Sequence, residues 1–271
     1  MLVFVLNAGS SSLKYQLINA KTAELKASGL VERIGIDGIL KHEVGENKKL
    51  TFELPIPTHK EAIELVLRIL TNDETKVINS IKEIQAIGHR VVHGGEFFKE
   101  STIVTKDVIE KIEQLIPLAP LHNPANIMGI KICQELMPNI PNVTVFDTAF
   151  HQTMTKENFL YAVPYADYTE HHLRKYGFHG TSHYYVSNET VKILNKKDSK
   201  IIVCHLGNGS SVCAVRDGKS ISTSMGLTPL EGLIMGTRSG DIDAGVIPYL
   251  MEKKNLTSNQ ILDYLNKKSG I

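Results

Sequence analysis

Two short apolar runs, residues 2–6 and 13–18, lie on either side of a polar loop near the start of the chain. They predict a pair of strands, and strand-like sequence continues to about residue 54. The later apolar runs that have the length of buried strands are 83–92, 143–146, 201–204 and 212–216.

Helix start signals lie between these runs. The first is Thr58-x-x-Glu61, which has the spacing of a capping box and precedes apolar residues at helical intervals. The other predicted starts are Thr105, Asn123-Pro124 as N-cap and first helical residue, the region of Ser182, Thr228-Pro229-x-Glu231 and Thr257-x-x-Gln260. Because strands alternate with helices, the pattern indicates the α/β class.

The loop after the first apolar run holds more hydrogen-bonding groups than a hairpin requires. It reads Asn-Ala-Gly-Ser-Ser-Ser from Asn7 to Ser12 and is followed by Lys14, whereas a plain hairpin connection needs only about two or three residues. The run at 201–204 leads into a similar loop, 207–211, and a returning strand. The chain therefore contains two copies of one strand–loop–strand pattern.

Both loops have the composition of a phosphate-binding turn. Glycine lets the backbone approach a ligand closely, successive backbone N–H groups form an anion-binding nest, and serine hydroxyls add donors. Lys14 adds a point charge suited to phosphate. The alternative is a pair of ordinary polar hairpins, but two such loops, each after a buried strand, favour two phosphate cradles that hold one nucleotide between two domains.

Two arginines and an aspartate are candidates for chemistry on a small anion. Arg90 lies late in a strand that leads to a glycine-rich loop, and Arg238 is flanked by glycines in 236–240. The alternative for each is a surface arginine paired with a carboxylate. Asp147 ends the run at 143–146, a normal active-site position in α/β folds, although it could instead cap the next segment.

Three histidines lie at predicted helix starts. His122 precedes Asn123-Pro124, where the helix dipole attracts anions. His179 and His183 have i, i+4 spacing, but the motif lacks the glutamate of H-E-x-x-H, so zinc binding is not expected.

Composition narrows the class of protein. The 271 residues are 42% hydrophobic and 22% charged with a net charge of +1, so a globular protein is expected and neither nucleic acid nor membrane is an expected partner. Cys133, Cys204 and Cys213 show no C-x-x-C spacing and are expected to be reduced core thiols. Without a signal-peptide pattern or an apolar stretch long enough for a membrane span, the expected location is the cytoplasm.

Seven motifs together carry a family resemblance. They are LNAGSSSLK at 6–14, GHRVVHGG at 88–95, PLHNP at 120–124, VFDTAFH at 145–151, GFHGTSH at 177–183, HLGNGSS at 205–211 and MGTRSG at 235–240. Through them the chain resembles the acetate kinases from Met1 to Ile271. The resemblance implies a two-domain, actin-like and ribonuclease H-like ATPase fold, with domains at 1–149 for acyl group and phosphate and at 150–271 for nucleotide.

The resemblance also implies a reaction and a site. The reaction is reversible in-line transfer of the γ-phosphoryl group of ATP to acetate, which gives acetyl phosphate and ADP with Mg²⁺. The catalytic residues implied are Asp147, His179, Arg238, Arg90 and His122. The implied contacts to the acyl substrate are Arg90, Val92, Leu121, Phe178 and Pro229. The implied contacts to the phosphates of ATP are Ser10, Ser12, Lys14, His205, Leu206, Gly207, Asn208 and Gly209. Asn7 would hold Mg²⁺ through its water shell.

The chemistry of the substrate adds one expectation. Acetate is ionised at neutral pH because simple carboxylic acids titrate near the values of Asp and Glu, so the nucleophile needs no general base. The difficulty is repulsion between two anions, which positive groups and alignment relieve. We therefore expect Asp147 to orient Arg90 or the histidines rather than to move a proton.

The resemblance also concerns chain length and assembly, and other functions remain as alternatives to it. Family members are considerably longer, so the chain is expected to be truncated, to lack adenosine-pocket loops and a second metal ligand, and to bind phosphate and acetate better than whole ATP. A homodimer is implied. The alternatives are a propionate or butyrate kinase, a sugar kinase, or an actin-like or chaperone-like nucleotide switch without catalysis.

Overall fold

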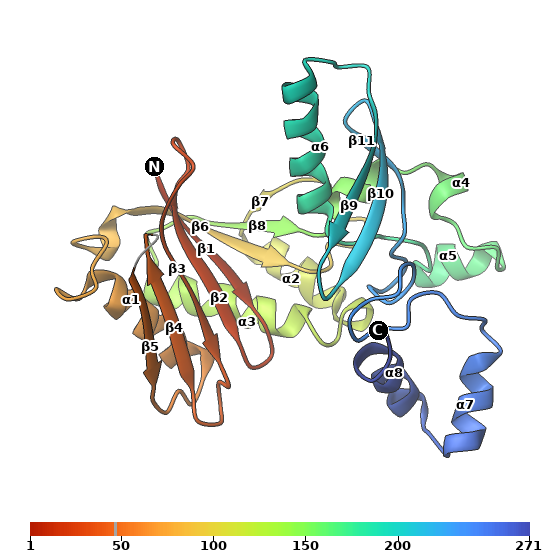
Figure 1. Cartoon of the computed structure of the whole chain (residues 1–271), viewed down its shortest axis with the longest axis horizontal. Helices are drawn as coiled ribbons and strands as arrows, with labels where there is room; N and C mark the ends of the chain where they lie inside the picture. The colour runs from red at the N-terminus through yellow and green to blue at the C-terminus, as the bar shows by residue number, and fades with distance from the viewer. Residues whose placement is uncertain (46–47) are drawn as a thin grey trace. The chain divides into compact units, whose positions relative to one another are not determined.

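The computed structural model describes residues 1–45 and 48–271, which form two compact units, Met1–Phe146 and Asp147–Ile271 (Figure 1). Each unit is built from strands and helices, which confirms the α/β class. The assignment of acyl-group and phosphate binding to residues 1–149, and of nucleotide binding to residues 150–271, stays a prediction.

The first unit contains an eight-stranded mixed sheet with the order β5-β4-β3-β2-β1-β6-β8-β7. Its strands are β1 (Leu2–Ala8), β2 (Leu13–Asn19), β3 (Glu24–Glu32), β4 (Ile39–Val44), β5 (Lys48–Glu53), β6 (Ile84–Val91), β7 (Thr102–Ile103) and β8 (Asn142–Phe146). The predicted hairpin of β1 and β2 is confirmed and begins an antiparallel meander. β6 and β8 run parallel to β1, so the loops after all three strands leave the same edge of the sheet.

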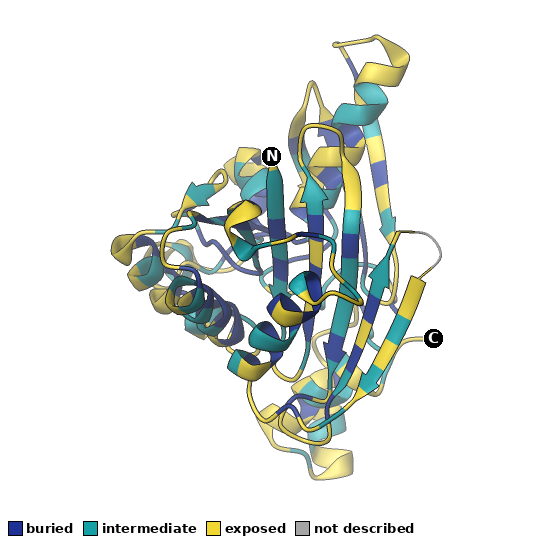
Figure 2. Cartoon of the chain, turned by 90° about the vertical axis from the view of Figure 1, so that its left-hand side faces the viewer, coloured by how far each residue is buried: buried dark blue, intermediate teal, exposed yellow. Residues whose placement is uncertain are grey.

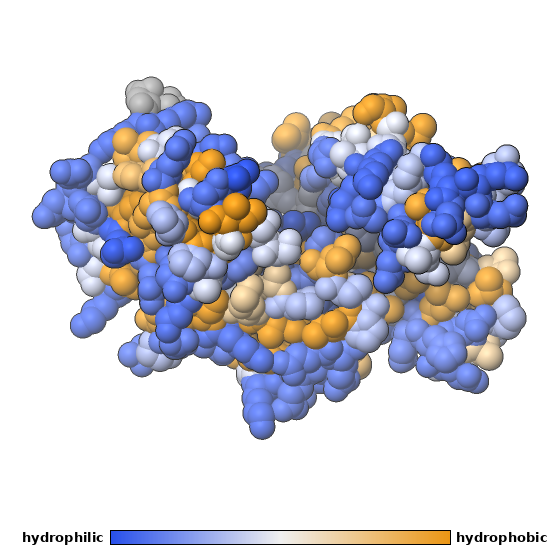
Figure 3. All heavy atoms as spheres, turned by 90° about the horizontal axis from the view of Figure 1, so that it is seen from below, coloured by the Kyte–Doolittle hydropathy of each residue, from blue (hydrophilic) through white to orange (hydrophobic). Residues whose placement is uncertain are grey.

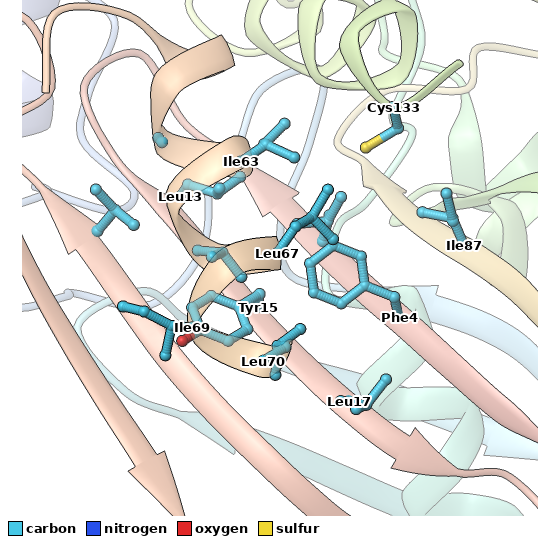
Figure 4. Packing of buried hydrophobic residues seen from close by; sticks show 14 of the residues in the cluster. Phe4, Leu13, Tyr15, Leu17, Ile63, Leu67, Ile69, Leu70, Ile87 and Cys133 are labelled. Atoms are coloured by element: carbon cyan, nitrogen blue, oxygen red, sulfur yellow. The ribbon is translucent and has the colours of Figure 1, made fainter. Parts of the chain in front are cut away.

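Helices α1 (His59–Thr71) and α3 (Asn123–Leu136) pack against this sheet, and α2 (Lys106–Gln114) packs on α3. Buried and exposed residues alternate along the strands, as a sheet covered on one face requires (Figure 2). Figure 4 shows the resulting core, in which side chains of α1 lie against those of β1 and β2. The labelled core residues are Phe4, Leu13, Tyr15, Leu17, Ile63, Leu67, Ile69, Leu70, Ile87 and Cys133.

The predicted starts of these helices are confirmed with one correction. Thr58 is the N-cap of α1 and accepts a hydrogen bond from the backbone N–H of Lys60. Asn123 is not the N-cap of α3. His122 occupies that position, and Asn123 is the first helical residue because its side chain bonds to a distant loop.

The second unit contains a three-stranded antiparallel sheet with the order β11-β10-β9. Its strands are β9 (Lys200–Leu206), β10 (Ser210–Arg216) and β11 (Lys219–Thr223), and its helices are α4 (Lys156–Phe159), α5 (Tyr165–His171), α6 (Gly180–Leu194), α7 (Val246–Lys254) and α8 (Ser258–Lys267). β9 and β10 form the second predicted hairpin. α6 packs against β9, and Val203, Cys213 and Val215 form a small core.

The helix predicted at Thr228-Pro229-x-Glu231 is wrong, because this segment consists of turns and bends. The Glu231 carboxylate, which a capping box would turn to the helix backbone, instead accepts from the Tyr161 hydroxyl and the Lys175 ammonium group. In contrast, the capping box of Thr257 and Gln260 is present and begins α8. The two sequence signals look alike, and distant partners of Glu231 decide the difference.

One of the three cysteines departs from the expected core position. Cys133 and Cys213 are buried free thiols, but Cys204 is exposed because alternate residues of β9 face solvent. Hydrophilic and hydrophobic residues are interspersed on the face drawn in Figure 3. Among residues 1–45 and 48–271, no helix combines the length and the apolarity that a membrane crossing needs.

Candidate functional site

The turn of the first hairpin is held from the core side by two side chains. Ala8 and Leu13 form the last strand pair, and the Gly9 N–H donates to the Ser12 carbonyl at 2.8 Å. The carbonyl of Gly9 accepts from His59 Nε2 at 2.7 Å, and that of Ala8 accepts from Asn126 Nδ2 at 2.9 Å. These bonds fix the backbone of the loop while they leave its side chains out of the core.

The predicted ligand groups of this hairpin remain available. Within the described part of the chain, the hydroxyls of Ser10 and Ser12 and the side chains of Asn7 and Lys14 have no hydrogen-bond partner. Asn7 and Lys14 lie directly opposite each other on β1 and β2 and line a surface groove of about 450 Å³. The amide oxygen of Asn7 can accept a hydrogen bond from a water molecule of hydrated Mg²⁺.

The loop after β6 is fixed by two asparagines of α3. Asn126 Oδ1 accepts from the Val92 N–H at 3.1 Å. Asn123 accepts from the His93 N–H at 3.2 Å and donates to the His93 carbonyl at 3.1 Å. Since Asn126 also bonds to Ala8, one side chain joins this loop to the first hairpin. The role of both asparagines was not predicted from the sequence, although the segment NP-x-N at 123–126 contains both.

The remaining predicted residues of this unit differ in exposure. Arg90 is half-buried at the end of β6, and Val92 is buried. His122 is half-buried at the start of α3, next to Leu121, which is 67% exposed. Their assignment to an acyl-substrate pocket stays a prediction.

In the second unit, Asp147 is fixed beside the start of α6. It is buried, and its carbonyl accepts from the Gly180 N–H at 2.8 Å. A Cβ at position 180 would lie 2.3 Å from this carbonyl oxygen, so glycine is required for the contact. Because glycine follows His179 in GFHGTSH, the backbone next to this histidine can lie directly against the backbone of Asp147.

His179 and His205 form a stacked pair of rings. His179 has φ of 58° at the N-cap of α6, a left-handed conformation that turns the chain into the helix. The ring centroids of His179 and His205 are 4.0 Å apart with 28° between the planes. His205 Nδ1 is 2.9 Å from Ser182 Oγ, and His179 Nδ1 is 2.9 Å from Ser211 Oγ. A serine thus holds each ring.

The turn of the second hairpin lies next to the segment 235–240. A Cβ built at Gly209 would lie 3.4 Å from Arg238 Nη1 and 3.5 Å from His179 Nε2. The Asn208 carbonyl accepts from the Gly236 N–H at 3.1 Å, and Arg238 Nη1 donates to the Pro229 carbonyl at 2.9 Å. The structure therefore brings a glycine turn, a guanidinium group and an imidazole ring together within this unit. Gly207 and Asn208 are exposed on this turn, and Leu206 is exposed at the end of β9.

Two buried histidines behind this group are neutral at pH 7. Burial lowers the pKa of His183 to about 3 and that of His151 to about 4. His151 Nε2 donates to the carbonyl of Phe178 at 3.0 Å, which fixes the residue before His179. His183 was considered above only as a metal ligand, but its Nε2 is 2.7 Å from Ser211 Oγ. Groups of three or more His, Cys, Asp or Glu side chains arranged to hold a metal are absent from residues 1–45 and 48–271.

Comparison with known proteins gives a consistent result. The model of the acetokinase family matches residues 2–271. The chain is 59% identical to an acetate kinase of Fusobacterium nucleatum and 55% identical to one of Caldanaerobacter subterraneus, with all of this chain aligned to 69% and 68% of those proteins.

Solved structures agree with these matches. A crystal structure of Porphyromonas gingivalis acetate kinase matches with a TM-score of 0.95 and 47% identity, over 99% of this chain and 68% of that one. A propionate kinase from Francisella tularensis matches with a TM-score of 0.93 and 46% identity, over the same shares. Since the family model covers nearly every residue and the fold agrees with solved members, the chain belongs to the acetokinase family.

Proposed function

We propose that this protein is an acetate kinase, which transfers the γ-phosphoryl group of ATP reversibly to acetate. The observation that carries the proposal is the meeting of Gly209, His179 and Arg238 in the second unit, in a chain of this family. A glycine turn leaves room for a phosphate, and guanidinium and imidazole N–H groups are donors for its oxygens.

In the proposed reaction a carboxylate oxygen of acetate attacks the γ-phosphorus. The new O–P bond forms as the bond to the β-phosphate oxygen breaks, and ADP leaves with the bonding electrons. Arg90 and Arg238 would reduce the repulsion between the two anions, and His179 and His122 would donate to the phosphoryl oxygens. Asp147 would orient these donors, because an ionised nucleophile has no proton to give up.

The phosphates of ATP would be held by both hairpins. Ser10, Ser12 and Lys14 offer side-chain donors, and 205–209 offer an imidazole and backbone N–H groups. Mg²⁺, with part of its water shell on Asn7, would supply charge neutralisation between phosphates. Val92, Leu121, Phe178 and Pro229 would surround the methyl group of acetate. A cytoplasmic location and a homodimer belong to the same proposal.

The test is trapping of the acyl phosphate with hydroxylamine. Purified full-length protein with acetate, ATP and Mg²⁺ is expected to give acetohydroxamate, and omission of any one of the three is expected to abolish it. Arg238→Ala is expected to lower kcat by about 100-fold, which is the scale for loss of a donor to developing charge. Arg216→Ala removes an exposed arginine of the same unit and is expected to retain activity.

Two outcomes would contradict the proposal. ATP hydrolysis without any hydroxamate would favour the nucleotide switch. A kcat/KM at least tenfold higher for propionate or butyrate than for acetate would favour the other acyl kinases, since one methylene changes discrimination by about 1–3 kcal/mol.

A further inference from the structure

One serine hydroxyl lies between two imidazole rings in the second unit. Ser211 Oγ is 2.9 Å from His179 Nδ1 and 2.7 Å from His183 Nε2. Both distances are those of real hydrogen bonds. Ser211 and His183 are completely buried, so water does not replace either bond.

The number of protons limits how these three groups pair. A serine hydroxyl carries one proton, so Ser211 donates to one ring and accepts from the other. His183 Nδ1 is buried and has no hydrogen-bond partner among the described residues. A buried N–H without an acceptor is rarer and more costly than a buried acceptor without a donor. The proton of the neutral His183 ring therefore belongs on Nε2, from which it is donated to Ser211.

The direction of the second bond follows from the first. Since Ser211 accepts from His183, its own hydroxyl proton is donated to His179 Nδ1. Nδ1 is then an acceptor, and the ring proton of His179 lies on Nε2. This is the nitrogen that lies 3.5 Å from the Cβ position of Gly209, next to Arg238.

We propose that Ser211 and His183 are positioning residues that fix the tautomer and the ring orientation of His179. They present its Nε2–H, next to Arg238, as a donor to an oxygen of the phosphoryl group in transfer. The inference rests on the proposed function and extends it, because neither Ser211 nor His183 touches the substrate in this account.

The tautomer can be measured without any assay of activity. In protein labelled with ¹⁵N-histidine, long-range ¹H–¹⁵N correlation spectra distinguish protonated from unprotonated ring nitrogens. His179, assigned by loss of its signals in His179→Asn, is expected to show unprotonated Nδ1 and protonated Nε2. A protonated Nδ1, alone or together with Nε2, would overturn the inference.

Kinetics then separates positioning from packing. Ser211→Ala is expected to lower kcat by about tenfold while KM for ATP and acetate changes by less than twofold, because the donor is retained but no longer aligned. Ser211→Thr keeps the hydroxyl and is expected to recover most of the rate. His183→Gln keeps an N–H donor for Ser211 and is also expected to retain most of the rate. This variant tests the same hydrogen bond if a Ser211 variant does not fold.

Ser187→Ala is the matched control, because Ser187 is a buried serine of α6 whose hydroxyl bonds to the Tyr184 carbonyl. Its kcat is expected to stay within twofold of wild type. A Ser211→Ala enzyme with wild-type kcat would overturn the inference alone. Wild-type protein that makes no acyl phosphate would contradict the proposed function, whatever the spectra show.

Discussion

Gly180 and Gly209 both lack a side chain, but for different reasons. At Gly180 a Cβ would lie 2.3 Å from the Asp147 carbonyl oxygen, so the fold itself requires glycine there. At Gly209 the same atom would lie at ordinary contact distance, 3.4 Å from Arg238 Nη1 and 3.5 Å from the His179 ring. The fold tolerates a methyl group at Gly209, but that methyl group would occupy the space beside both donors.

Gly209→Ala is therefore expected to weaken binding without loss of stability. Affinity for ATP should fall by about tenfold, since a tenfold change requires only about 1.4 kcal/mol. The melting temperature should stay equal or rise slightly, because alanine restricts the unfolded chain at a position without left-handed φ. Calorimetric titration and thermal unfolding measure the two effects. Gly180→Ala should show the opposite pattern, with a clear loss of stability, and equal melting temperatures for both variants would contradict this reading.

At the scale of an element, α3 connects two loops of the first unit through the side chains of its first turns. Asn123 binds both backbone groups of His93, and Asn126 binds Val92 on one side and Ala8 on the other. Both asparagines are buried. The helix therefore holds the loop after β6 and the first hairpin in one arrangement, in addition to covering the sheet.

Asn126→Ala is expected to destabilise the protein and to impair substrate binding together. It leaves a buried N–H at Val92 and a buried carbonyl at Ala8 without this partner, and each loss costs about 1–3 kcal/mol. Urea unfolding should show a lower midpoint, and KM for acetate and ATP should both rise. Asn139→Ala, at an exposed asparagine beyond the end of α3, is the control and should change neither. A normal KM in a destabilised Asn126→Ala enzyme would show that α3 supports the fold but not the loops.

At the scale of the whole chain, buried neutral histidines occur in both units. Burial lowers the pKa of His89, His93 and His151 to about 4 and that of His183 to about 3. In the unfolded chain a histidine titrates near 6.5, so below that pH the unfolded state binds protons that the folded state does not. These histidines therefore do not reduce the free energy of unfolding above about pH 6.5, and they reduce it progressively as the pH falls toward 4.

The free energy of unfolding is therefore expected to fall between pH 7 and pH 5, before most carboxylates titrate. Each histidine contributes a slope of at most about 1.4 kcal/mol per pH unit. Urea midpoints at several pH values measure the effect. His89→Gln removes one imidazole and leaves an amide that can still bond to Asn142, the partner of His89 at 2.7 Å. Its stability should fall less steeply with acid, and a slope identical to that of wild type would contradict the assignment.

The sequence by itself determined the features that depend on neighbours along the chain. The periodicity of 2–6 and 13–18 predicted the first hairpin, and the Thr257 capping box predicted α8. The seven motifs predicted the family that the comparisons show. These signals are local, because strand alternation and helix caps are set within a few residues.

Only the tertiary structure decided which partner each polar side chain takes. Glu231 accepts hydrogen bonds from Tyr161 and Lys175 instead of starting a helix. Asn123 bonds to the backbone of His93 instead of capping α3. Ser211 bonds to two histidines about 30 positions away in the sequence. The physical reason is that a buried polar group must find a partner, and the nearest one in space is set by how the strands and helices pack. The position of a residue in the sequence pattern predicts the helix, strand or loop that contains it. The packed fold determines which hydrogen-bond partner its side chain finds, and therefore what that side chain does.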